Sequence, residues 1–128
     1  DQWVPYGERQ NYLLEADVGV CLHQDIAETR LAFRTRLIDY IWTGLPMVVS
    51  GGDSLSETVD QFQLGKVVPC GDAAQIARAL IEVLSLADPR ESYRERFEAV
   101  RSQLNWKRAV EPLLRFLSNP QRAPDLSH

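Results

Sequence analysis

The 128-residue sequence lacks the features that mark nucleic-acid-binding and membrane-spanning proteins. It has no Lys/Arg-rich block and a formal net charge of -4, whereas nucleic acids and anionic membrane surfaces are bound through clustered positive charge. No apolar run approaches the roughly 18 residues that a membrane-spanning helix needs. These absences argue against nucleic acid as a main partner and against a transmembrane segment.

Cysteine is also scarce. The chain has only Cys21 and Cys70, and neither belongs to a CxxC motif or a Cys/His cluster. We interpret both as small, reduced core residues, with a disulfide and a metal site as the alternatives. Reduced cysteines favour a cytoplasmic location, and the inner face of the membrane is an alternative if missing parts of a longer protein supply the contact. We expect no bound metal.

Methionine occurs once, as Met47, and the chain begins at Asp1. We therefore expect the sequence to be a piece of a longer protein, and a targeting segment could have been lost with the rest.

What is present is typical of a globular domain, with 45% apolar and 25% charged residues. Apolar runs at 17–22, 45–50 and 66–70 predict strands, and amphipathic segments between and after them predict helices. The pattern predicts an α/β domain over residues 1–118, with a parallel sheet of three to four strands covered by helices on both faces, followed by a flexible tail at 119–128. Trp42 and Trp106 are expected in the core.

Ligands of parallel α/β sheets bind beyond the carboxyl ends of the strands. Here those ends are followed by residues 23–33, predicted to be irregular, by residues 50–54, and by Gly71 and Asp72. A helix expected from about Arg34 would offer unpaired N–H groups at the same edge, together with Thr35 and Arg36, to an anion. Asp39 lies one turn further on and could accept a hydrogen bond from a ribose, which suggests a nucleoside diphosphate. The alternative is a surface ion pair between Arg36 and Asp39.

A family resemblance strengthens the nucleotide interpretation. The run LIDYIWTGLPMVVSGGDSLSETV, preceded by ADVGVCL and followed by LGKVVPCGDAAQIARALIEVL, resembles the carboxyl-terminal domain of a GT-B glycosyltransferase of the group 1 (RfaG-like) kind. Asp39 stands where the family has its ribose-binding glutamate, and Pro46 to Val49 matches the Pro-Val-Val segment. Gly51, Gly52 and Glu57 match the elements that follow.

The resemblance implies a Rossmann-like donor-binding domain of an enzyme that transfers a sugar from a UDP- or GDP-linked donor to an acceptor. The acceptor-binding amino-terminal domain and the first basic strands are absent from this chain, so the fragment alone is expected to be inactive. The resemblance implies no cofactor and identifies no catalytic residue. The candidate donor-binding residues, from position and resemblance together, are His23, Glu28, Arg34, Thr35, Arg36, Leu37, Asp39, Gly51 and Gly52.

The chain also departs from the family. Where members with a Glu-x7-Glu motif have their first glutamate, this sequence has Leu31, and Glu28 lies three residues upstream. The stereochemical outcome therefore stays open. So do the alternatives of a GT-B-related nucleotide-sugar epimerase and of a non-catalytic α/β regulatory or assembly module. Because the strand at 17–22 lacks the partner that the family has, a homodimer through that strand edge is also expected.

Overall fold

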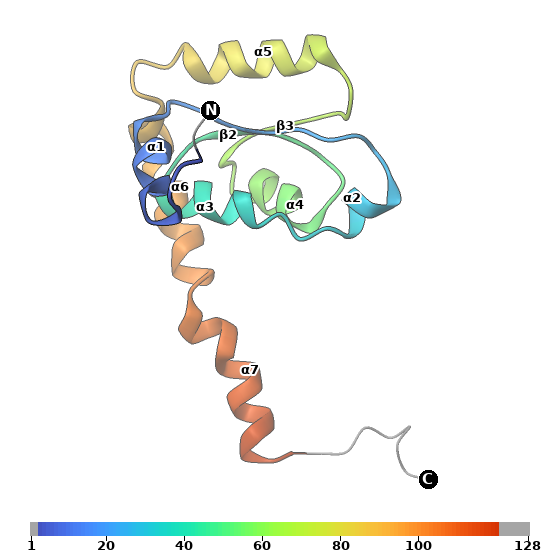
Figure 1. Cartoon of the computed structure of the whole chain (residues 1–128), viewed down its shortest axis with the longest axis vertical. Coiled ribbons are helices and arrows are strands. Elements are labelled where there is room, and N and C mark those ends of the chain that lie inside the picture. The colour runs from blue at the N-terminus through green and yellow to red at the C-terminus, as the bar shows by residue number, and fades with distance from the viewer. Residues whose placement is uncertain (1–2, 121–128) are drawn as a thin grey trace.

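The computed structural model describes residues 3–120 and shows an α/β fold with a layered body, from which the carboxyl-terminal helix extends (Figure 1). Its elements in chain order are a 3-10 turn Tyr6–Glu8, α1 Arg9–Glu15, β1 Gly19–Cys21, α2 Ala27–Leu31, α3 Thr35–Thr43, β2 Met47–Ser50, α4 Ser54–Gln61, β3 Gly65–Val68, α5 Ala73–Leu84, α6 Pro89–Gln103 and α7 Trp106–Ser118.

The sheet is open, parallel and three-stranded, in the order β1-β2-β3. Val20 pairs with Val48, which pairs with Lys66. Every residue of the central strand β2 is buried, as expected for an apolar strand with a neighbour on each side and a layer on each face. The predicted fold class, a parallel α/β sheet with flanking helices, is confirmed at this level.

Two apolar clusters fill the two faces of the sheet. The larger one contains buried residues of α3, α4 and α6, such as Leu37, Val59 and Phe97, together with Met47 and Val49 of β2. The smaller one joins Val48 and Val68 to Ala79 and Val83 of α5. Alternate β2 residues point to opposite faces, so α5 covers one side of the sheet alone while α3, α4 and α6 cover the other (Figure 1).

Several helix boundaries agree with capping signals in the sequence. The side chains of Asp53, Asp72, Asp88 and Asn105 each accept a backbone N–H from the first turn of the helix that follows. Such capping satisfies N–H groups that a helix leaves unpaired. At Asp72 the side chain of Gln75 also donates back to the carboxylate, at 2.7 Å, and the capping interactions hold the pKa of Asp72 below its usual value.

Arg90 joins the body to the amino-terminal helix. Its guanidinium donates to the carbonyls of Thr43 and Ala16, each at 2.8 Å, and also to those of Gly44 and Leu13. These carbonyls lie at the carboxyl ends of α1 and α3, where intrahelical donors run out. One charged side chain therefore satisfies acceptors from two helices.

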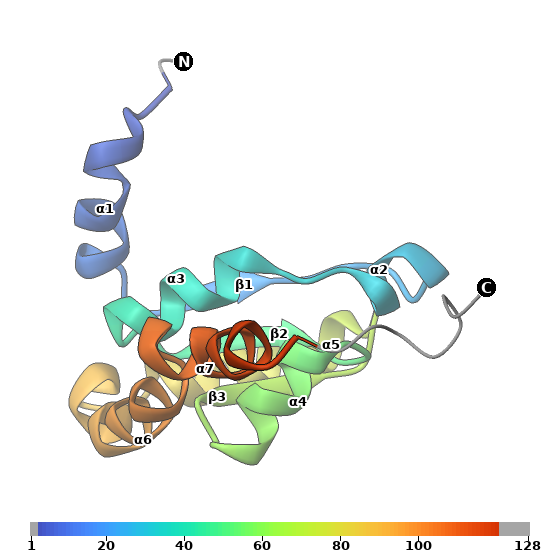
Figure 2. The ribbon, with the colours of Figure 1, turned by 90° about the horizontal axis from the view of Figure 1, so that it is seen from below.

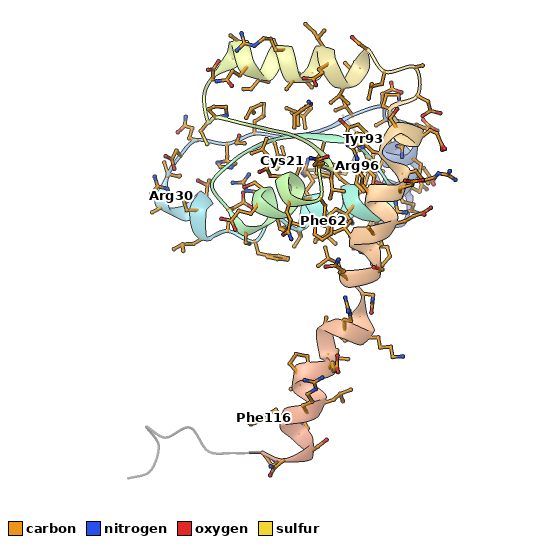
Figure 3. All side chains as sticks on the ribbon, turned by 180° about the vertical axis from the view of Figure 1, so that it is seen from behind. Cys21, Arg30, Phe62, Tyr93, Arg96 and Phe116 are labelled. Carbon is orange, nitrogen blue, oxygen red and sulfur yellow. The ribbon has the colours of Figure 1, made fainter. Side chains whose placement is uncertain are left out.

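The structure corrects several core assignments. Trp42 is 52% exposed and Trp106 is 81% exposed, so neither is a core residue. Trp106 begins α7, which buries none of its residues and points away from the sheet, with Phe116 far from the body (Figure 3). Amphipathic spacing alone indicates one apolar face, but it does not indicate whether anything packs against that face. Of the expected tail, residues 121–128 lie outside the described part of the chain.

Strand β1 is an edge of the sheet, because it pairs with β2 alone among residues 3–120. Val20 and Leu22 are each 41% exposed, so the expected buried strand at 17–22 is shorter and more open than the sequence suggests. Figure 2 shows α1 standing away from the layers beside this edge. The homodimer through β1 stays a prediction.

Candidate functional site

The carboxyl ends of the three strands meet at one edge of the sheet, and a hollow of about 530 Å³ opens there. Its lining comes from the segments that follow each strand: Asp25, Arg30, Gly51, Gly52, Pro69 and Cys70. A second hollow, of about 320 Å³, lies on the α4 side of the same Gly-Gly turn and includes Ser56 and Glu57. Gly52 has φ +109°, a conformation that favours glycine. The Gly51–Gly52 turn predicted from sequence is thus the wall shared by two hollows.

Another hollow of about 530 Å³ lies at the opposite end of β3, and its lining includes Gly65, Lys66 and Glu82. Lys66 and Glu82 pair with each other, and no predicted site residue lines this hollow. The carboxyl edge is the better candidate because parallel sheets place ligands there and because the Gly-Gly turn lies there.

Asp53 is the most buried charged side chain at this edge, with 1% of its side chain exposed. Its Oδ1 accepts the N–H groups of Leu55 and Ser56 at 2.9 and 3.1 Å, and its own N–H donates to Ser56 Oγ. The carboxylate thereby caps α4. Because Asp53 occupies the beginning of α4, that helix terminus does not offer an open anion site.

Arg34 is the partner of Asp53. Arg34 Nη2 lies 3.1 Å from Asp53 Oδ2, and only 8% of the Arg34 side chain is exposed. Its Nη1 is buried without a hydrogen-bond partner among the described residues. The sequence suggests Arg34 as a phosphate ligand, but the structure turns its guanidinium inward to a carboxylate. Its role here is to join the beginning of α3 to the Gly-Gly turn.

His23 is held beside the same carboxylate. Its backbone N–H donates to Ser50 Oγ at 2.9 Å, which ties the end of β1 to the end of β2. In the ring, Nδ1 lies 2.9 Å from the Gln24 carbonyl oxygen and Nε2 lies 3.9 Å from Asp53 Oδ2. His23 does not line the hollow itself; Cys70 does, with its Sγ 3.9 Å from His23 Nδ1.

The outer rim of the hollow is formed by Asp25 and Arg30. Arg30 Nε and Nη2 donate to the two carboxylate oxygens of Asp25 at 2.7 and 2.9 Å. This hydrogen-bonded pairing lowers the pKa of Asp25 and raises that of Arg30. Arg30 projects from α2 at the end of the molecule opposite α6 (Figure 3). The segment 23–33, predicted to be irregular, contains the short helix α2. Two local contacts stabilise it: Asp25 accepts from Arg30, and the Thr29 hydroxyl donates to the Gln24 carbonyl.

Glu28 also lies on α2, where it is exposed, and it does not line the hollow. Of the carboxylates of Asp25 and Glu28, that of Asp25 lines the hollow together with Gly51 and Gly52. Contact of Glu28 with a donor sugar stays a prediction.

The first turn of α3 presents two predicted residues to solvent and buries the third. Thr35 and Arg36 are exposed, whereas Leu37 is fully buried in the larger cluster. Leu37 therefore cannot offer its side chain to a ligand. Arg34 precedes the helix and makes no side-chain cap. The N–H groups of Thr35 and Leu37 donate instead to the backbone carbonyls of Phe33 and Arg34, at 3.1 and 2.9 Å.

Asp39 does not pair with Arg36. Its Oδ1 accepts a hydrogen bond from Arg9 Nη2 of α1 at 3.1 Å, with 29% of the Asp39 side chain exposed. The expected surface ion pair within α3 is thus replaced by one between two helices. Tyr40, the next residue, donates its hydroxyl to the Val20 carbonyl at 3.2 Å, and burial raises the pKa of this phenol.

Asp53, Asp25 and Cys70 were not among the predicted site residues, although sequence signals for two of them exist. Asp53 follows two glycines and precedes a helical segment, the position of an N-cap. Cys70 is the last residue of the predicted third strand, at the edge where ligands bind. Nothing in the spacing signals that Asp25 would face the Gly-Gly turn, because that depends on how the 23–33 segment folds back.

Among residues 3–120, no group of three or more His, Cys, Asp or Glu side chains is placed to hold a metal ion. In the same part of the chain, every helix is too short or too polar to cross a membrane. Comparison with known proteins adds no relative: no protein-family model, no curated protein and no solved structure matches this chain.

Proposed function

We propose that this chain is the donor-binding part of a glycosyltransferase that moves a sugar from a nucleoside-diphosphate sugar to an acceptor. The nucleoside diphosphate binds at the carboxyl edge of the sheet, between the first turn of α3 and the Gly51–Gly52 turn. The observation that carries the proposal is the 3.1 Å contact between Arg34 and Asp53, because it brings the beginning of α3 next to that turn.

The chemistry of the two segments suits a diphosphate. The first turn of α3 supplies the positive end of a helix dipole, while the N–H groups of Thr35 and Leu37 already donate to the carbonyls of Phe33 and Arg34. Thr35 and Arg36 add an exposed hydroxyl and an exposed cation. The Gly-Gly turn permits a close approach, since no side chain projects from it. The corresponding terminus of α4 is capped by Asp53, so the anion is directed to α3.

The ribose would lie one turn further along α3, near Asp39. Arg9 engages Oδ1 of that carboxylate, and the remaining oxygen can accept a hydroxyl hydrogen. The sugar would extend into the hollow lined by Asp25 and Arg30. We expect weak binding, because Arg34 is neutralised by Asp53. Sugar transfer would need the acceptor-binding domain as well.

The test is calorimetric titration of the 128-residue chain with UDP and GDP. We expect one of them to bind, and Arg36→Ala to raise the Kd about tenfold, as the loss of a charge-assisted contact predicts. Arg94→Ala is the matched control, since Arg94 is 61% exposed and lies on α6, away from the edge. Failure of the wild type to bind either nucleotide, or binding unchanged in the Arg36→Ala/Asp39→Ala double variant, would overturn the proposal.

A further inference from the structure

One buried carboxylate contacts several of the segments that build the carboxyl edge. Asp53 belongs to the turn after β2 and caps α4 through Leu55 and Ser56. Its Oδ2 lies 3.1 Å from Arg34, which precedes α3, and 3.9 Å from His23, which follows β1. The two oxygens thus have different neighbours: Oδ1 binds its own helix and Oδ2 faces the two other segments.

We propose that Asp53 is a positioning residue that fixes the first turn of α3 against the Gly51–Gly52 turn and so sets the geometry of the anion site. Asp53 touches no ligand in this scheme and acts through Arg34. The identity of the ligand as a nucleoside diphosphate rests on the proposed function. The ordering of the first turn of α3 by Asp53 does not depend on it.

The contacts near Arg34 explain why α3 would depend on Asp53. Arg34 immediately precedes the helix and makes no side-chain cap. Its guanidinium also lies 3.4 Å from the Thr29 carbonyl oxygen, and its own carbonyl accepts the N–H of Leu37 at 2.9 Å. Residues 32–34 connect α2 to α3 without regular structure. The ion pair with Asp53 is therefore the main side-chain contact that holds the entry to α3 in place, beside the backbone hydrogen bonds from Thr35 to Phe33 and from Leu37 to Arg34. Its burial shields it from solvent and salt.

A neutral side chain of the same shape cannot replace the carboxylate. Asparagine would still accept the N–H groups of α4 through its amide oxygen. However, it would leave the guanidinium of Arg34 as an uncompensated buried charge, which favours its movement toward water. A purely capping role therefore predicts that Asp53→Asn changes little, and a positioning role predicts that the entry to α3 becomes disordered.

The experiment compares Asp53→Asn, the double variant Arg34→Met/Asp53→Asn, and Asp88→Asn. Asp88 caps α6 through the Glu91 N–H at 3.0 Å and so controls for the change of cap chemistry alone. The double variant removes both charges and leaves no unpaired guanidinium. It therefore still tests the loss of the ion pair if the single variant does not fold. NMR relaxation then measures the backbone order of Thr35 and Arg36, and calorimetry measures the nucleotide Kd.

We expect the order parameters of Thr35 and Arg36 to fall from about 0.85 toward 0.6 in the variants at Asp53, with no change in Asp88→Asn. We also expect the nucleotide Kd to rise at least about fivefold, although Arg36 is intact. Rigid Thr35 and Arg36 in a folded variant at Asp53 would overturn the positioning role. Because the relaxation measurement uses no nucleotide, a wild type that fails to bind UDP and GDP would refute the proposed function without affecting this result.

Discussion

Arg9 Nη2 lies 3.1 Å from Asp39 Oδ1, so α1 shares the carboxylate that the sequence indicates as a ribose acceptor. With 45% of the Arg9 side chain and 29% of the Asp39 side chain exposed, the pair is partly solvated. Pairs of this kind contribute about 0–1 kcal/mol to folding. The small contribution of this ion pair to stability therefore does not by itself explain why residue 39 is an aspartate.

Comparison of Asp39→Asn with Arg9→Ala separates the two roles of Asp39. If the carboxylate serves the ribose, Asp39→Asn should raise the nucleotide Kd by about fivefold or more, because a hydroxyl loses a charged acceptor. Arg9→Ala should leave that Kd within about twofold while removing the same ion pair. Calorimetry gives the Kd, and urea denaturation checks that both variants lose less than about 1 kcal/mol of stability. Equal Kd values in both variants and the wild type would leave only the ion pair.

Arg90 should be far more important for stability than its exposed neighbours on α6. Arg90→Met keeps much of the apolar stem but leaves carbonyls of Thr43 and Ala16 without their donor. We expect the free energy of unfolding to fall by about 2–4 kcal/mol, since hydrogen bonds from a charged group are worth about 1.5–3 kcal/mol each. Arg94→Met, at an exposed position, should change it by less than about 0.5 kcal/mol. A stability loss in Arg90→Met no greater than that of Arg94→Met would contradict this role.

Truncation of two aromatic residues in the carboxyl-terminal helices should change the free energy of unfolding by very different amounts. Phe97 is 1% exposed and Trp106 is 81% exposed. Phe97→Ala should cost about 3–5 kcal/mol by opening a cavity in the larger cluster. Trp106→Ala should stay within about 0.5 kcal/mol of the wild type, because it removes no buried contact in this fold. Denaturation by urea measures both, and a large loss in Trp106→Ala would show that Trp106 packs against the body.

Sequence patterns predict this fold well where the stabilising contacts join residues that are close together in the sequence. The apolar run at Met47–Ser50 has no polar face to expose, and it becomes the central strand. Asp72 and Gln75 cap α5 because the capping geometry involves neighbours in sequence. Gly44 likewise ends α3, with φ +64° in the left-handed region that favours glycine. In each case the determining contacts lie within a few residues of one another.

Predictions that needed long-range packing were less successful. The apolar spacing of α7 resembles that of α6, yet α6 buries Tyr93, Phe97 and Val100 and α7 buries nothing. At the candidate site, the edge of the sheet and the Gly-Gly turn follow from topology. The inward turn of Arg34 does not, since its partner Asp53 comes from a different segment and only the three-dimensional fold brings them together.

Gly65 gives a last prediction, about the pairing of β2 and β3. A Cβ built on Gly65 would overlap the Met47 carbonyl oxygen, a backbone atom of the neighbouring strand. The two strands would have to separate, and the register Met47–Gly65 would be strained or lost. We expect Gly65→Ala to reduce the free energy of unfolding by about 3 kcal/mol or more.

Gly7→Ala is the matched control for Gly65→Ala, because nothing lies within 4 Å of a Cβ at Gly7. It should change stability by less than about 1 kcal/mol, the size of the difference in backbone propensity between the two residues. Urea denaturation followed by circular dichroism compares the two variants. If Gly65→Ala proves as stable as Gly7→Ala, then β3 does not approach β2 as closely as the parallel register at Gly65 requires.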